Sequence, residues 1–301
     1  MTAPTPKYLF IIGAPRCGTT AIANQLGAQP GFFLPKRKEP CFFTDFGERT
    51  WAGPKGKDFA AHLVTSWADY QALYTKASPD QWRIDASTDY LSNNAAPARI
   101  ASLADTDDIR IVCILRDPVK RMFSEYGLCK RMMLEPLDFI DSIKFEKNRI
   151  DEAYPPFFYH VQRSKYTDGL KRYFNRFGKS KIKIFIFENH TSQDEIISSI
   201  CDFAGVEYCK IKDPFRKSES FSYKSTSLNR MLRKDNSARA FIRKIVPDSI
   251  RKSIWRYIYR FNTIKETMTE KELLYALNCV QEERDTVAAL TGLDTSRWSH
   301  V

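Results

Sequence analysis

Three short runs of continuously apolar residues alternate with segments of helical pattern in the first two thirds of the chain. Such runs are typical of strands that are buried on both faces of a parallel sheet. The predicted strands are residues 8–12, 109–115 and 182–187. The predicted helices beside them are residues 19–28, 118–130, 166–177 and 194–204. This alternation predicts an α/β fold in which helices flank a mostly parallel central sheet.

The last third of the chain has a different pattern, which is helical only from Ser227 onward. Pro247 interrupts it, and residues 270–290 predict one long final helix that ends near Gly292. No internal repeat or low-complexity linker divides the chain. We therefore predict a single domain over residues 1–301, with an α/β core at 8–210 and a basic loop and helical part at 211–301.

Composition and charge narrow the class of protein. Hydrophobic residues make up 43% and aromatic residues 13% of the 301 positions, which excludes a disordered chain or a fibrous repeat. The 47 Lys and Arg residues exceed the 36 Asp and Glu residues, and the net charge of +11 suggests an anionic partner. Residues 210–265 contain 16 of these bases and only four acids. The sequence therefore predicts a nearly neutral body with one basic segment.

The cysteines and the N-terminal residues bear on location. The seven cysteines are an odd number without a C-x-x-C pair, and Cys113 lies inside an apolar run. This pattern indicates unpaired thiols in a reducing compartment instead of a disulfide framework or a zinc site. Residues 1–7 lack a basic region, and the run at 8–12 is too short for a signal peptide or a membrane span. We expect a soluble, cytoplasmic protein, and the oligomeric state is left open.

The segment Gly-Ala-Pro-Arg-Cys-Gly-Thr-Thr at residues 13–20 connects the first predicted strand to the first predicted helix. A turn at a helix N-terminus directs several backbone N–H groups to one point, where the helix dipole favours an anion. Gly13 and Gly18 have the spacing of a Walker A loop, but Thr19 stands where that motif needs lysine. Arg16 supplies a cation from within the loop. The loop predicts phosphate binding and weakens an NTPase interpretation, with an ordinary strand–turn–helix corner as the alternative.

The form P-[KR]-x-G-T-T after an N-terminal strand resembles the 5′-phosphosulfate loop of sulfotransferases that use 3′-phosphoadenosine 5′-phosphosulfate (PAPS). Residues 111–126 resemble the strand and helix with which that family binds the 3′-phosphate. The resemblance implies a P-loop-type α/β fold, PAPS as cofactor, adenosine 3′,5′-bisphosphate (PAP) as product, and no metal. The residues that it places at the cofactor are Arg16, Cys17, Gly18, Thr19, Thr20, Arg116, Ser124 and, in a later basic loop, Arg216, Lys217 and Lys224.

The segment Lys-Glu-Pro-Cys-Phe-Phe at residues 38–43 carries the candidate base. It resembles the part of glycan-modifying and bacterial sulfotransferases in which the glutamate is the catalytic base, which implies this role for Glu39. The same resemblance implies that Arg16 stabilises charge on the transferred group. We expect the cations of residues 36–38 to keep Glu39 ionised, and the two phenylalanines to anchor the segment. A solvated charge run before a core anchor is the alternative interpretation.

Candidate acceptor residues come from further segments that are similar to the family. Residues 84–91 resemble the box at a strand end that lines the acceptor cleft, with Ala86 where some glycan sulfotransferases have lysine. The histidine at 160 follows an aromatic run, and it is either a packing residue or a cleft residue that is held in reserve as a base. The candidate acceptor residues are Lys38, Ser87, His160 and Tyr166.

The basic segment has several possible partners. The resemblance implies that residues 215–225 close over the 3′-phosphate of the cofactor. Residues 239–261 interleave apolar and basic positions, which fits a solvated helix face, a surface for an anionic acceptor, or peripheral contact with an acidic membrane. Nucleic acid is disfavoured because no recognised binding module accompanies the bases.

Taken together, these features predict a PAPS-dependent sulfotransferase that acts on a hydroxyl or amine of a small-molecule, glycan or lipid acceptor. Two alternatives stay open: a P-loop kinase or NTPase, and a non-catalytic module that binds an anionic surface.

Overall fold

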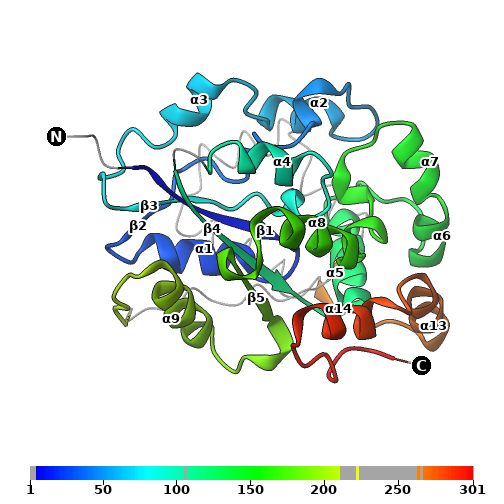
Figure 1. Cartoon of the computed structure of the whole chain (residues 1–301). Helices are drawn as coiled ribbons and strands as arrows, with labels where there is room; N and C mark the ends of the chain where they lie inside the picture. The colour runs from blue at the N-terminus through cyan, green and yellow to red at the C-terminus, as the bar shows by residue number, and fades with distance from the viewer. Residues whose placement is uncertain (1–4, 105–106, 211–221, 224–262, 265–266, 301) are drawn as a thin grey trace, which may run out of the picture.

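Five parallel strands form the central sheet of the computed structural model, which describes residues 5–104, 107–210, 222–223, 263–264 and 267–300. The strand order is β2-β3-β1-β4-β5 (Figure 1). These strands are β1 (Lys7–Gly13), β2 (Phe32–Phe33), β3 (Trp82–Asp85), β4 (Asp108–Leu115) and β5 (Ile182–Ile186). A separate antiparallel ribbon pairs β6 (Ser222–Tyr223) with β7 (Thr263–Ile264).

The three strands predicted from apolar runs are confirmed as β1, β4 and β5. Side chains of β1 and β4 fill both sides of the sheet, and Leu9, Ile11, Ile111 and Ile114 are fully buried. In the register of the sheet, Phe10 pairs with Ile111 of β4 on one side and with β3 on the other. The central position of β1 explains why its sequence is apolar without interruption.

Helices cover both faces of the sheet (Figure 1). On one face α1 (Thr19–Gly27) lies beside α9 (Gln193–Ala204), and on the other α4 (Ala96–Ala101) lies beside α8 (Thr167–Phe177). The peripheral helices are α2 (Gly56–His62), α3 (Trp67–Ala72), α6 (Phe139–Lys144), α7 (Glu146–Asp151), α13 (Glu270–Cys279) and α14 (Glu283–Thr291). Among the described helices, none has the length and apolar character that crossing a bilayer requires.

Helix α5 (Pro118–Arg131) begins directly after β4. The Oδ1 atom of Asp117 accepts a hydrogen bond from the Val119 N–H at 2.9 Å, and Pro118 occupies the first helical position. Proline is favoured there because its missing N–H would have no partner in the helix. The helix predicted at 118–130 is thus confirmed within one residue at its end.

The carboxyl ends of β1, β3 and β4 meet at one edge of the sheet. After β1 the chain forms β2 and β3 on one side of β1 in the sheet, and it then crosses to form β4 on the opposite side of β1. The strand order therefore reverses at β1. Hydrogen bonds join the loops there: the Leu91 N–H donates to the Ile12 carbonyl at 2.9 Å, and the Ala14 N–H donates to the Ile114 carbonyl at 2.7 Å. In open α/β sheets such a switch point is where ligands bind.

The prediction of one long final helix at residues 270–290 is wrong. The helix breaks at Val280, where φ is −135° and ψ is 23°, and α14 starts a new direction at Glu283. The buried carboxylate of Glu283 accepts hydrogen bonds from the N–H groups of Tyr166 at 2.8 Å and Thr167 at 3.0 Å. It thereby caps the N-terminus of α8, a long-range contact that helical periodicity cannot reveal.

Candidate active site

The loop between β1 and α1 has the backbone of an anion-binding turn. Arg16 and Gly18 have left-handed φ angles of 69° and 79°, and a Cβ atom on Gly18 would lie 3.1 Å from the Phe187 ring. No acceptor among the described residues is hydrogen-bonded to the backbone N–H groups of residues 16–20. Successive free N–H groups at a helix N-terminus form a concave site for phosphate or sulfate oxygens.

The structure brings together three of the residues predicted at the cofactor. The Nε atom of Arg16 donates to the Ser124 hydroxyl at 3.2 Å, and Arg116 donates to the Arg16 carbonyl at 3.3 Å. The pKa of Arg16 is lowered because its guanidinium is removed from water and lies near other cations, first Arg131 and then Arg116. An anion in this place would offset both effects, so the electrostatics favour a ligand with several negative charges.

Arg116 itself fits a phosphate ligand. It follows the end of β4, its guanidinium lies 5.7 Å from the centre of the Phe187 ring, and its Nε is 3.8 Å from Glu188. The Nε atom is buried and has no hydrogen-bond partner among the described residues. A buried donor without a partner is rare, and a forked guanidinium pairs well with phosphate oxygens. The residues present therefore fit the phosphate groups of the cofactor.

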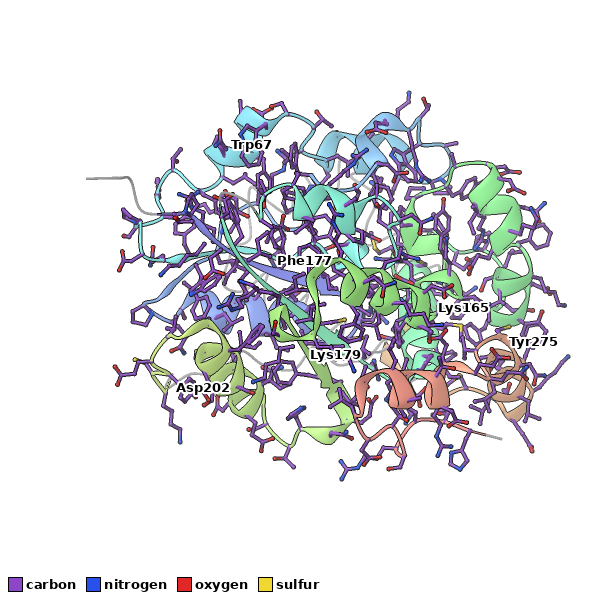
Figure 2. All side chains as sticks on the ribbon, in the orientation of Figure 1. Trp67, Lys165, Phe177, Lys179, Asp202 and Tyr275 are labelled. Atoms are coloured by element: carbon purple, nitrogen blue, oxygen red, sulfur yellow. The ribbon has the colours of Figure 1, made fainter. Side chains whose placement is uncertain are left out.

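The segment that carries Glu39 is fixed by hydrogen bonds and by ring contacts. Glu39 and Cys41 have left-handed φ angles of 47° and 52°, and the Cys41 N–H donates to the Ser87 hydroxyl at 3.0 Å. Phe42 stacks on Tyr70 with ring centres 4.8 Å apart. The exposed Trp67, which Figure 2 labels at α3, stacks on the same tyrosine. The anchoring role expected of the two phenylalanines is thus confirmed, since Phe43 is also buried in the core against Phe10 and Tyr70.

The electrostatic environment of Glu39 differs from the expectation. Burial and the nearby Asp89 raise its pKa to about 7, while Arg163 and a hydrogen bond from the Thr88 hydroxyl at 3.3 Å partly oppose this rise. The flanking cations were expected to keep the group ionised, and this was wrong. Their side chains do not enclose the carboxylate: residues 36 and 38 are exposed, and Arg37 donates to the carbonyls of residues 62 and 63.

A buried network of charges links Glu39's surroundings to α5. Arg163 lies 2.9 Å from Asp89 and also donates to Glu125, which pairs with Arg121 at 2.8 Å. All four side chains are buried. Burial by itself would raise the pKa of Glu125, but the neighbouring Arg121 and Arg163 lower it to about 2. Because Glu125 follows Ser124 in the chain, the network joins the predicted phosphate site to the predicted base.

Three of the four candidate acceptor residues lie in the interior. His160 is fully buried, with its ring nitrogens 3.7 Å from Glu125 and 4.0 Å from Glu135, which favours the packing role. Ser87 donates to Asp85 at 2.6 Å, and Tyr166 donates to the Arg116 carbonyl at 2.9 Å. The hydroxyls of Ser87 and Tyr166 are thus engaged by neighbouring groups of the protein, and their role towards an acceptor stays a prediction.

The other predicted residues divide into two groups. Cys17 and Thr19 are buried in the loop and at the start of α1, and Thr20 is exposed. The three cations of the later basic loop, Arg216, Lys217 and Lys224, lie outside the described residues.

Sequence reasoning gave no role to three residues that surround Glu39: Thr88, Asp89 and Arg163. Thr88 and Asp89 lie within the segment 84–91 that resembles the acceptor-cleft box, and Arg163 lies shortly before α8, but nothing in either segment marks them as partners of Glu39.

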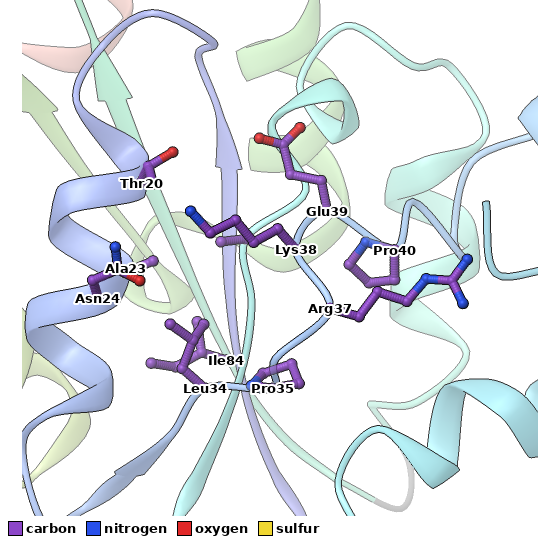
Figure 3. Close-up of a pocket in the computed structure, with 11 residues that line it drawn as sticks. Thr20, Ala23, Asn24, Leu34, Pro35, Arg37, Lys38, Glu39, Pro40 and Ile84 are labelled. Atoms are coloured by element: carbon purple, nitrogen blue, oxygen red, sulfur yellow. The ribbon is translucent and has the colours of Figure 1, made fainter. Parts of the chain in front are cut away.

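A pocket opens beside Glu39 (Figure 3). It lies between the first turns of α1, the segment 34–40 and the end of β3, and its volume is about 370 Å³ with its mouth included. The carboxylate of Glu39 and the ammonium of Lys38 point towards the side of Thr20, whereas Arg37 points away. The pocket therefore brings the predicted base next to the loop that would hold the phosphosulfate.

The fold and the site together define a P-loop-like α/β protein with an anion-binding loop at the switch point of its sheet. The family model described as the sulfotransferase domain matches residues 6–256. The chain therefore belongs to the PAPS-dependent sulfotransferase family and is a sulfotransferase enzyme, as the resemblance in its sequence implied.

Solved structures are similar to the chain at low sequence identity. A sulfotransferase from Alicyclobacillus acidocaldarius is 24% identical with a TM-score of 0.73, over 97% of this chain and 98% of that one. The sulfotransferase domain from the curacin biosynthetic pathway is 15% identical with a TM-score of 0.44, over 68% and 76%. Retinol dehydratase in complex with androsterone and inactive cofactor PAP is 14% identical with a TM-score of 0.42, over 69% and 62%. No curated protein matches the sequence.

Proposed function

We propose that this enzyme transfers the sulfuryl group of PAPS to a hydroxyl or amine of an acceptor, with Glu39 as the base. The loop at residues 16–20 would hold the 5′-phosphosulfate, and Arg116 with Ser124 would hold the 3′-phosphate. The observation that carries the proposal is the hydrogen bond from Arg16 to Ser124. It joins two motifs that are 108 residues apart in sequence and that fit the two phosphate groups of one nucleotide.

In this proposal each residue has a defined task. The N–H groups of the loop and the Arg16 guanidinium stabilise charge on the sulfuryl group and on the phosphate that leaves. Glu39 accepts the acceptor's O–H or N–H proton as the new bond to sulfur forms and the bond from sulfur to the phosphate oxygen of PAPS breaks. PAP leaves with the electron pair of that bond. A pKa near 7 suits this task, since the group is then ionised in part at neutral pH and is basic enough to take the proton.

Binding of PAP tests the proposed cofactor site. Isothermal titration calorimetry without Mg²⁺ should show saturable PAP binding, and Arg16→Ala and Arg116→Ala should each weaken it by about tenfold to a hundredfold. Arg176→Ala removes an exposed arginine of α8 and serves as the control. Binding of ATP that requires Mg²⁺, with no binding of PAP, would support the kinase or NTPase alternative instead.

Transfer tests the role of Glu39. Glu39→Gln keeps the shape of the side chain but cannot accept the proton, so we expect transfer from radiolabelled PAPS to fall by about a hundredfold or more. PAP affinity should stay within about twofold of the parent. Turnover that survives this substitution would assign the base to another residue.

The acceptor would be a small molecule, a glycan or a lipid, and the basic segment would face it or an acidic membrane. Most of that segment lies outside the described residues. Sedimentation with vesicles that contain phosphatidylserine, compared with neutral vesicles, tests the membrane contact.

Nucleic-acid binding is not part of the proposal, and independence from metal and a cytoplasmic location stay predictions. Among the described residues no group of three or more His, Cys, Asp and Glu is placed to hold a metal ion.

A further inference from the structure

The segment that follows α14 contacts the turn that carries Arg116. Residues 292–300 leave α14 and pass the end of β5 (Figure 1). Trp298 is fully buried, and its indole Nε1–H donates to the Glu188 carboxylate at 3.2 Å. Arg297 donates to the Glu188 carbonyl at 2.7 Å. No step of the transfer proposed above uses this segment, although it holds a neighbour of the predicted phosphate arginine.

The same segment also holds the start of α5. The N–H and the hydroxyl of Ser299 both donate to Oδ2 of Asp117, at 2.8 and 2.6 Å. Asp117 is buried, so these hydrogen bonds offset the cost of removing its carboxylate from water. We call residues 297–299 the clasp, because they bind Glu188 and Asp117, the acidic residues on either side of Arg116.

Glu188 lies between the clasp and Arg116. Its carboxylate accepts a hydrogen bond from the Asp117 N–H at 3.2 Å in addition to the one from Trp298. It is 3.8 Å from Nε of Arg116, which is too long for a hydrogen bond. That Nε atom is buried and has no hydrogen-bond partner among the described residues. The Glu188 carboxylate is therefore held just beyond hydrogen-bond reach of a donor that a phosphate could use.

A carboxylate that was free to move in this place would compete with the ligand. A shift of about 1 Å would let Glu188 accept the Arg116 Nε–H in a short, charge-assisted hydrogen bond. The N–H groups of Asp117 and Trp298 satisfy the carboxylate where it stands, so it gains little from that shift. Loss of the indole donor would leave Arg116 as a partner within reach, and a phosphate would then have to displace Glu188.

We propose that the clasp, through Trp298, holds the Glu188 carboxylate away from Arg116 and thereby keeps the Arg116 guanidinium open for the 3′-phosphate of the donor nucleotide. Trp298 is in this view a positioning residue, which acts on donor affinity through Glu188. This inference rests on the proposed role of Arg116, and it goes further because it makes donor binding depend on a segment outside both phosphate motifs.

Calorimetry of the full chain with Trp298→Phe tests the clasp. The substitution keeps an aromatic ring and removes the indole N–H, so the Kd for PAP should rise about fivefold to tenfold. The Kd for adenosine 5′-phosphosulfate, which lacks the 3′-phosphate, should stay within about twofold of the parent. An equal rise for both nucleotides, or a rise for neither, would overturn the inference.

Trp82→Phe is the matched control. It removes a buried indole N–H that donates to the Ala204 carbonyl at 2.9 Å, and Trp82 begins β3 at the end of the sheet opposite to Arg116. This variant should bind both nucleotides as the parent does. A rise in the Kd for PAP as large as that of Trp298→Phe would mean that any lost indole hydrogen bond has this effect, and would also overturn the inference.

Rescue by Glu188→Gln separates positioning from general destabilisation. The substitution keeps the size of the side chain and removes the charge that competes with the phosphate. In the Trp298→Phe background it should return the Kd for PAP to within about twofold of the parent. The gain should be at least about threefold larger there than in the parent background, since the two residues act on one contact. Equal gains in the two backgrounds, or no gain, would refute the link through Glu188.

NMR of the parent chain keeps the inference testable even where Trp298→Phe does not fold. PAP should move the Arg116 Nε–H proton signal downfield, because a new hydrogen bond forms, and should leave the Trp298 Nε1–H signal in place. An Arg116 signal that does not move, or a Trp298 signal that moves to the position of a solvent-exposed indole, would contradict the clasp.

The proposed role of Arg116 and the inference about Trp298 fail in different ways. Full PAP affinity in Arg116→Ala would refute the role of Arg116 and the inference with it. Weak PAP binding by Arg116→Ala together with parent-like binding by Trp298→Phe would support the cofactor site and refute the clasp.

Discussion

The raised pKa of Glu39 predicts that this residue destabilises the folded protein in neutral and alkaline solution. Glu39→Gln removes the ionisable group and keeps an oxygen that can accept the hydrogen bond from Thr88. The pKa of Glu39 is raised from an ordinary 4.5 to about 7. Each pH unit between these values corresponds to about 1.4 kcal/mol, so ionised Glu39 costs the folded state about 3 kcal/mol.

The direction of the effect follows from which state binds the proton more tightly. Below pH 4.5 both the folded and the unfolded chain keep the proton, and Glu39 costs nothing. Between pH 4.5 and about 7 the unfolded chain releases the proton first, so the free energy of unfolding falls as the pH rises. Above pH 8 the cost is complete. We therefore expect Glu39→Gln to exceed the parent by about 3 kcal/mol at pH 8.5 and by less than about 1 kcal/mol at pH 5.

Urea denaturation followed by circular dichroism at the two pH values measures this difference. Glu152→Gln, which removes an exposed carboxyl at the end of α7, is the control for the loss of one acidic group. A stability gain of equal size at pH 5 and pH 8.5, or no gain at either pH, would refute the reasoning. The carboxylate would then be well solvated in the folded state and would be a weaker base than we propose.

Three further predictions concern the surroundings of the site. Thr88→Val removes the hydrogen bond that lowers the pKa of Glu39, so the pH midpoint of kcat/KM should move to higher pH; an unmoved midpoint would argue against Glu39 as the base. Gly18→Ala places a methyl 3.1 Å from a phenylalanine ring at a left-handed φ of 79°, and calorimetry should show weaker PAP binding, which unchanged affinity would contradict. Glu283→Ala uncaps α8 and should lower the free energy of unfolding by about 2 kcal/mol in urea while PAP affinity is kept; a neutral result would mean that water replaces the cap.

The parts of the fold that the sequence predicts correctly are those in which local pattern and burial agree. The strands β1, β4 and β5 are apolar throughout because both of their faces are covered, and α5 begins at a proline after a capping aspartate. Strand β2 has only Phe32 and Phe33, too few residues for a period to be recognised. The break at Val280 lies just before Glu283, whose contact with α8 joins residues more than 110 positions apart, and local periodicity encodes neither.

In the candidate site, too, the sequence reveals the features that have a local pattern and not those that depend on distant residues. The loop and the Arg116 segment can be recognised because each is a continuous motif at the end of a strand. The environment of Glu39 cannot, since Asp89 and Arg163 reach it from the end of β3 and from the residues before α8. Sequence neighbours at 36–38 suggested a cationic environment, but alternate side chains of an irregular segment point in different directions, and Arg37 turns to the carbonyls of residues 62 and 63.

The buried charge network also has a consequence for how enzymes with this site can diverge. Arg163 contacts both Asp89 and Glu125, and Glu125 also contacts Arg121. Loss of one member leaves an uncompensated buried charge, which typically costs about 3–5 kcal/mol, so single changes here are removed by selection and viable changes must come in pairs. We expect relatives to keep or replace these four residues as a unit, so that the link between the phosphate site and the base changes as a whole.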